Sequence, residues 1–216
     1  MSISRRFFLS SRIAMLDCWM SEFSEQEIGE FIVKKEGRYD SQGRLQVYNL
    51  PSGDGGGSYE VAGINIKYHP KKARALKALI VKGEHDKAKQ EAIDYIIDYT
   101  KRVAPWHPDI RVQCYLRDMA FNRGPTGCAK IFQHALKTAR SYAGSIDGKV
   151  GDKTKAAAKK HKAEDLLLRL VLSRQWYERE VIGRSERSKF WAGLVNRWID
   201  AVQTCLEVGD PHNSKC

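Results

Sequence analysis

Apolar residues recur at helical spacing along most of this chain. In residues 70–83, Ala73 and Leu76 fall on one face of a helix while lysines occupy the other. Ser24, with Glu27 three positions later, forms a capping box that sets the start of the second helix. The full pattern predicts helices over residues 5–20, 24–35, 70–82, 84–102, 109–122, 126–142, 152–161, 163–182 and 186–206.

Residues 40–66 depart from this helical pattern. Residues 45–48 and 59–64 have strand-like composition, and they flank a Gly-rich turn at residues 53–58. This region is therefore expected to form a short, irregular β-hairpin or a three-stranded sheet. Together with the helices, it predicts a mostly α-helical α+β fold.

Glu36 lies where the helical pattern ends and turn chemistry begins, and we interpret it as a catalytic acid. Gly37 follows it directly and favours the end of the helix. The negative end of the helix dipole favours the protonated form of a carboxyl group, which is the form that a proton donor needs. Most helix-end glutamates are only exposed surface residues, so this interpretation depends on the residues that follow.

Two carboxylates downstream could act with Glu36. Glu60 lies on the returning strand, and Asp54 lies in the Gly-rich loop. A helix-end glutamate that faces a carboxylate on a small sheet is an arrangement suited to cleaving glycosidic bonds. Glu60 and Asp54 therefore compete for the second catalytic role.

Several polar and aromatic residues are candidates for binding a sugar chain beside Glu36. Tyrosines could stack on sugar rings, and amide or imidazole groups could bind acetamido or hydroxyl groups, although each could equally be a packing or capping residue. Trp176, Trp191 and Trp198 are expected in the core instead. The candidates for substrate binding are Tyr39, Tyr59, Asn65, Tyr68, His69, Asp118 and Asn122.

Residues 36–39, Glu-Gly-Arg-Tyr, resemble the Glu-Gly-Gly-Tyr signature of glycoside hydrolase family 108. This family comprises phage and bacterial N-acetylmuramidases with a lysozyme-like fold, and the resemblance implies that Glu36 is the catalytic residue. Residues 54–57 are similar to the family's Asp-x-Gly-Gly stretch. Arg38 replaces the second glycine of the signature, and Glu60 stands where the family has a threonine.

The resemblance continues from about residue 25 to 205. It implies cleavage of the β-1,4 bond between N-acetylmuramic acid and N-acetylglucosamine, with bacterial peptidoglycan as partner and with no cofactor or metal. In the stretch at residues 146–154, Asp152 stands where the family's motif has a proline. The similar stretches are residues 117–125 (a helix end), 146–154 (an Asp-Gly motif of the associated C-terminal segment), and 174–178 and 190–198 (its last two helices).

We expect one lysozyme-like domain over residues 1–216, and a monomer. A chain of this length can bury a sizeable core. Its expected parts are an N-terminal helical extension (1–23), a catalytic module (24–136), a C-terminal helical module (137–208) and a tail (209–216).

The formal net charge of +11 predicts attraction to an anionic partner. The substrate supplies one in the acidic peptides of peptidoglycan, and a basic face could also bind an anionic wall or outer-membrane surface. The basic helix at residues 152–161 supports a rival, a nucleic-acid-binding protein, but no binding signature accompanies it. The five cysteines have no metal-ligand spacing, and no apolar run is long enough to cross a bilayer.

Residues 4–9 resemble a twin-arginine export signal, but Arg12 and Asp17 interrupt the apolar region. We therefore expect an amphipathic helix, and a protein that stays in the cytoplasm until it is released to the cell wall.

Two further functions stay open. A lytic transglycosylase would need Glu36 alone, and a peptidoglycan-binding module would need no acid.

Overall fold

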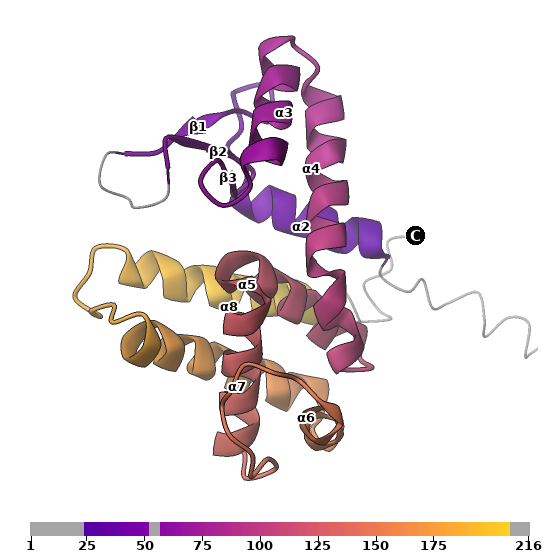
Figure 1. Cartoon of the computed structure of the whole chain (residues 1–216), viewed down its shortest axis with the longest axis vertical. Helices are drawn as coiled ribbons and strands as arrows, with labels where there is room; N and C mark the ends of the chain where they lie inside the picture. The colour runs from indigo at the N-terminus through magenta and orange to yellow at the C-terminus, as the bar shows by residue number, and fades with distance from the viewer. Residues whose placement is uncertain (1–23, 52–56, 208–216) are drawn as a thin grey trace, which may run out of the picture. The chain divides into compact units, whose positions relative to one another are not determined.

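The computed structural model describes residues 24–51 and 57–207 (Figure 1). The predicted helix at residues 5–20 and the tail at 209–216 lie outside these residues. The chain divides into two compact units. The N-terminal unit comprises Ser24–Pro105 and Leu116–Cys128, and the C-terminal unit includes Trp106–Tyr115 and the chain from Ala129 onward. Helices and one small antiparallel sheet confirm the mostly helical α+β class.

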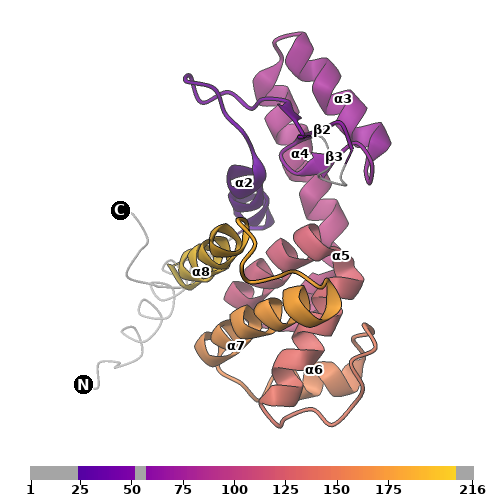
Figure 2. The same ribbon diagram turned by 90° about the vertical axis from the view of Figure 1, so that its left-hand side faces the viewer.

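Three helices frame the N-terminal unit: α2 (Glu25–Glu36), α3 (Pro70–Val81) and α4 (His85–Thr100). The capping box between Ser24 and Glu27 starts α2 as predicted. At Gly29, a Cβ atom would lie only 2.8 Å from Cγ2 of Ile93. The absence of a side chain at Gly29 therefore lets α2 approach α4 closely, while α3 and α4 run side by side in both views (Figure 1, Figure 2).

The sheet of the N-terminal unit has three strands, β1 (Tyr48–Asn49), β2 (Tyr59–Val61) and β3 (Ile64–Asn65), in the order β1-β2-β3. All neighbours are antiparallel. The strands are shorter than the sequence predicts. Leu45 forms only an isolated bridge with Tyr39, and its carbonyl oxygen lies 3.0 Å from Nδ1 of His85.

Helix α5 (Ile110–Thr138) contributes to both units and is kinked at Gly124, where φ is 68° and ψ is 161°. This left-handed conformation suits glycine, and Pro125 can begin the next helical stretch because it needs no backbone donor. The sequence predicts two helices, 109–122 and 126–142. The kink separates the same two segments.

The C-terminal unit adds α6 (Asp152–Ala158), α7 (Ala163–Trp176), a π-helical turn η2 (Tyr177–Val181) and α8 (Trp191–Glu207). A short 3₁₀ helix η1 (Lys101–Trp106) precedes α5. Helix α8 begins five residues later than predicted, because the hydroxyl oxygens of Ser185 and Ser188 accept backbone hydrogen bonds from Arg187 and Phe190 in non-helical turns.

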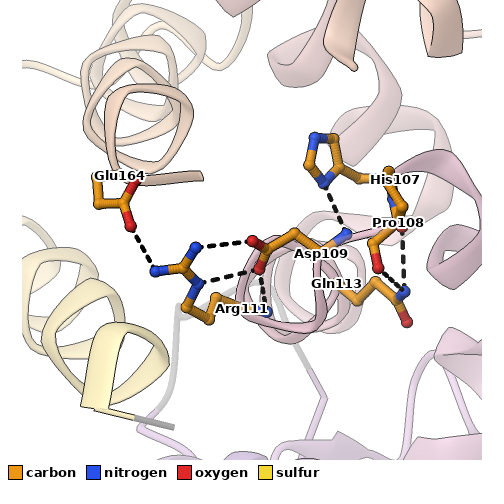
Figure 3. A network of polar contacts seen from close by, with 6 residues as sticks. All are labelled: His107, Pro108, Asp109, Arg111, Gln113 and Glu164. Atoms are coloured by element: carbon orange, nitrogen blue, oxygen red, sulfur yellow. Dashed lines mark hydrogen bonds and ion pairs between the residues drawn. The ribbon is translucent and has the colours of Figure 1, made fainter. Parts of the chain in front are cut away.

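A polar network ties the start of α5 to α7 within the C-terminal unit (Figure 3). Asp109 caps α5 by accepting a hydrogen bond from the backbone N–H of Arg111, and its carboxylate also binds the Arg111 guanidinium. Arg111 in turn donates to Glu164 of α7. Burial alone would raise the pKa of Asp109, but the hydrogen bonds and charge of Arg111 outweigh it and lower this pKa. The network therefore has a structural role.

Gln133 fastens the loop that contains the Asp-Gly motif. Its Nε2 donates to Oδ1 of Asp147 at 2.7 Å and to the carbonyl oxygen of Lys149 at 2.9 Å. Its Oε1 accepts from the backbone N–H of Gly148 at 2.9 Å. Gln133 is fully buried. The Asp-Gly motif therefore has a structural role, because its loop is held in place by hydrogen bonds to one buried amide.

We expect Gln133→Leu to lower the free energy of unfolding by about 2 to 3 kcal/mol, because the substitution removes all three hydrogen bonds that hold the loop to this buried side chain. Urea unfolding followed by circular dichroism measures this loss. The control Gln203→Leu changes an exposed glutamine of α8, and it should shift the free energy by less than about 0.5 kcal/mol. Equal effects of the two substitutions would contradict the structural role of Gln133.

Histidine burial predicts a pH dependence of stability. Burial lowers the pKa of His69, His107 and His134. The unfolded chain therefore takes up protons on these residues at a higher pH than the native protein does, and stability is lost as pH falls through the ordinary histidine pKa of about 6.5. We expect a lower free energy of unfolding at about pH 5.5 than at about pH 7.5, and a smaller difference in His107→Gln. A flat urea-unfolding profile over this range would contradict the prediction.

Candidate active site

Glu36 is the last residue of α2 and is half-buried. The backbone N–H of Gly37 closes the helix by donating to the carbonyl oxygen of Val33 at 2.8 Å. The Glu36 carboxyl group accepts a hydrogen bond on Oε1 from Nδ2 of Asn122, at 2.6 Å. The side chain of Glu36 is thus oriented by an amide that lies 86 residues away in the sequence.

Asn122 is itself fixed by the helix that carries it. Its Nδ2 also donates to the backbone carbonyl oxygen of Asp118, one turn earlier on α5, at 3.3 Å. Asn122 lies just before the kink at Gly124, so the end of this helical segment delivers the amide to Glu36. Asp118 shares this helix face but is fully buried, so its side chain is shielded from solvent.

The turn between β2 and β3 lies against the side chain of Glu36. Gly63 in this turn has φ of 71°, and the preceding Ala62 also has a positive φ, 49°. Two residues with positive φ match the type I′ turn that joins antiparallel strands. A Cβ atom at Gly63 would lie 3.0 Å from Cε1 of Phe121 and 3.1 Å from Cβ of Glu36. The bare backbone of Gly63 therefore brings the sheet next to the candidate acid.

Glu60 is the one carboxylate in the three strands. It is half-buried on β2, opposite Tyr48 of β1 and Asn65 of β3. Cross-strand partners share a face of a sheet, so Glu60 lies on the same face as Asn65. Asp54, the competing candidate, lies outside the described residues.

Three candidate tyrosine and asparagine positions have structural partners. The hydroxyl group of Tyr39 donates to the carbonyl oxygen of Val33 at 3.1 Å, and burial raises the pKa of Tyr39. Asn65 is buried, and its Oδ1 accepts from the backbone N–H of Lys67 at 2.9 Å. The Tyr59 ring lies under Nζ of Lys77, which is 4.3 Å from the ring centroid. These contacts account for the placement of the three side chains without a ligand.

Tyr68 differs, because 64% of its surface is exposed. Nζ of Lys67 lies 5.5 Å from the centroid of its ring. Among the described aromatic candidates, Tyr68 is thus the most accessible for stacking on a sugar.

His69 belongs to an aromatic cluster that the sequence pattern does not reveal. Its Nδ1 lies 2.8 Å from the Tyr95 hydroxyl oxygen, and its ring meets Tyr95 and Tyr99 edge-on. The ring of Tyr99 packs edge-on against Phe121, which borders Gly63. The alternative role of His69 as a helix cap is not observed, since its side chain makes no cap bond to α3. The spacing of Tyr95 and Tyr99, one helical turn apart, is the signal that could have indicated this cluster.

No metal centre is evident in the part of the chain that the structure describes, where no three His, Cys, Asp or Glu side chains gather as ligands. The described helices also include none with the length and apolar character needed to span a bilayer.

Residues 128–199 match the model of a family described as "Predicted Peptidoglycan domain". Among solved structures, the chain is similar to Brucella abortus SagA, with a TM-score of 0.59 and 21% sequence identity over 86% of this chain and 95% of that chain. This likeness shows a shared fold. No curated protein matches the chain. The family match supports a peptidoglycan-related protein, and membership of glycoside hydrolase family 108 stays a prediction.

Proposed function

We propose that this protein is a peptidoglycan hydrolase of the muramidase type, with Glu36 as its general acid. One observation carries this proposal. Glu36 ends a helix beside a small sheet, and its carboxyl group is held by Asn122 and flanked by the bare backbone of Gly63. The peptidoglycan family match at residues 128–199 supplies the substrate class.

The hydrogen bond from Asn122 orients the carboxyl group of Glu36, because Oε1 accepts the amide N–H. In the proposed mechanism this carboxyl group carries the proton of a general acid. Glu36 would donate this proton to the oxygen that leaves when the bond between N-acetylmuramic acid and N-acetylglucosamine breaks. Asn122 is thus a positioning residue in this mechanism.

Glu60 is our choice for the second carboxylate, since β2 carries it in the sheet next to Glu36. It would activate a water molecule or stabilise positive charge at the anomeric carbon. Carboxyl groups about 5 Å apart favour retention of configuration, whereas a separation of about 6.5 to 9.5 Å favours inversion. The anomeric form of the first product, measured by NMR, reports which applies. Glu60→Gln and Asp54→Asn, assayed separately, identify the partner of Glu36.

The direct test is incubation of the protein with purified peptidoglycan sacculi. We expect the turbidity to fall and the soluble fragments to carry reducing ends, identified by mass spectrometry. Fragments with 1,6-anhydro ends would instead identify a lytic transglycosylase. Binding without any released fragment would identify a binding module, and salt-sensitive binding to duplex DNA without cleavage would identify the nucleic-acid-binding alternative.

We expect Asn122→Leu to lower kcat by about 10- to 100-fold with little change in KM, because a misplaced acid affects the transition state more than substrate binding. Asn122→Gln, which retains the amide, should recover part of this loss. Asn196→Leu, at an exposed position of α8, serves as control. A rise in KM with unchanged kcat would instead make Asn122 a substrate-binding residue.

A further inference from the structure

The outer face of α7 carries a row of apolar side chains that the C-terminal unit leaves exposed. Leu168 is 60% exposed, Leu172 is 63% exposed, and Trp176 is partly exposed. Residues four apart follow one face of a helix, so these three form a continuous row. Leucines are mostly buried in folded proteins, and exposed apolar patches mark sites of interaction.

His134 of α5 extends this row with a second aromatic ring. Its ring stacks on Trp176, with the centroids 3.9 Å apart and the planes 7° from parallel, and its Nδ1 lies 3.0 Å from Oγ of Ser173. Burial lowers the pKa of His134, so the imidazole is neutral near pH 7. Within residues 24–51 and 57–207, neither Nε2 of His134 nor Nε1 of Trp176 has a hydrogen-bond partner. Both atoms are available to a ligand.

Charged side chains border the same face. Arg169 is exposed next to Leu168, and Lys130 precedes His134 by one turn of α5. Asp165 is also exposed, one turn before Arg169. The surface thus combines stacking rings, aliphatic groups, two ring nitrogens and two cations.

We propose that this α7 surface, made of Lys130, His134, Leu168, Arg169, Leu172 and Trp176, binds the glycan strand of peptidoglycan. The inference rests on the proposed function, because that function supplies the polysaccharide. The apolar faces of N-acetyl sugars pack against aromatic and aliphatic side chains, and their acetamido oxygens accept from ring N–H groups. Arg169 and Lys130 match the carboxylates of the lactyl groups and stem peptides.

The match to the peptidoglycan family model covers all six residues. Other occupants fit less well. A stable dimer buries about 800 Å² on each partner, and the apolar part of this row is three side chains. An anionic membrane would meet Asp165 on the same face. A sugar chain requires neither a large apolar area nor a uniformly basic one.

The test measures co-sedimentation with purified sacculi in a Glu36→Gln background, so that binding is not followed by cleavage. We expect Leu172→Ser and, separately, Trp176→Leu to weaken binding by about 10-fold or more, since stacking and desolvated contacts dominate such sites. Ile199→Ser changes an aliphatic residue of α8 that is 44% exposed, and it should leave binding within about 2-fold. Circular dichroism checks that each variant is folded, and the exposed position of Leu172 makes its substitution the decisive one.

Leu172→Ser binding as tightly as the parent would overturn the proposal. The same holds if Leu172→Ser leaves sacculus binding unchanged but converts a dimer into a monomer in sedimentation velocity, since the surface would then serve self-association. The result of this binding experiment can be told apart from a failure of the proposed hydrolase function. Cleavage by the protein with Glu36 intact tests the hydrolase, whereas these variants compare binding alone.

Discussion

Replacing Glu36 with Gln is expected to lower the rate of sacculus cleavage by about 100- to 10,000-fold, the usual contribution of general acid catalysis. Glutamine has nearly the same shape, and its Oε1 can still accept the hydrogen bond that Asn122 donates to Glu36. What it lacks is the proton for the leaving oxygen. The initial rate of turbidity loss, together with the release of reducing ends, measures the effect.

The matched control for this substitution is Glu30→Gln. Glu30 lies on the same helix, is exposed, and accepts a hydrogen bond from Gln26 at 3.0 Å. Glu30→Gln should cleave sacculi within about 2-fold of the parent rate, because surface substitutions have small effects. Undiminished cleavage by Glu36→Gln would rule out Glu36 as the acid and remove the basis of the muramidase proposal.

The second large effect is expected at Gly63. An added Cβ would meet Cε1 of Phe121 at 3.0 Å and Cβ of Glu36 at 3.1 Å, at a backbone φ of 71° that side chains disfavour. Strain and overpacking together should lower the free energy of unfolding by about 2 to 4 kcal/mol in Gly63→Ala. The residual activity of the folded fraction should also fall by about 10-fold, because Glu36 has to move.

Gly83→Ala separates these two causes. Gly83 has φ of 80°, but an added Cβ would have nothing within 4 Å. Gly83→Ala should therefore lower the free energy of unfolding by about 1 kcal/mol, from backbone strain alone. It should keep full activity. Urea unfolding and the turbidity assay on both variants make the comparison. If Gly63→Ala and Gly83→Ala lose equal stability and neither loses activity, the close packing of the turn against Glu36 has no functional consequence.

Local signals in the sequence predict the helix ends correctly. The capping box at Ser24 and the turn chemistry after Glu36 gave the bounds of α2 to within one residue, because both act over a few positions. The kink at Gly124 was also predictable from the Gly-Pro pair that ends one helical pattern and begins another. The strand bounds are predicted less well, since residues 45–47 have strand composition but lie outside the three-stranded ladder, with Leu45 in an isolated bridge to Tyr39.

The geometry of the candidate site depends on contacts between residues that are distant in the sequence. Asp118 and Asn122 are equivalent by helical spacing, but one is fully buried and the other binds Glu36. Tyr95 and Tyr99 were missed because their importance comes from contacts with His69 and Phe121, which are distant in the sequence. Trp176 was expected in the core with Trp191 and Trp198. Only Trp198 is fully buried, and Trp176 stacks on His134 at the surface.

Local sequence patterns are enough to predict the helical composition, the position of the sheet within residues 40–66, and a glutamate at the end of α2. Periodicity, capping and turn preferences carry this information, since each depends on neighbouring residues. By contrast, the contact of Asn122 with this glutamate, the close approach of Gly63 to it and the exposure of the row on α7 become visible only in the folded structure. These facts depend on which distant side chains pack together, and packing is set by the whole fold rather than by any short stretch of chain.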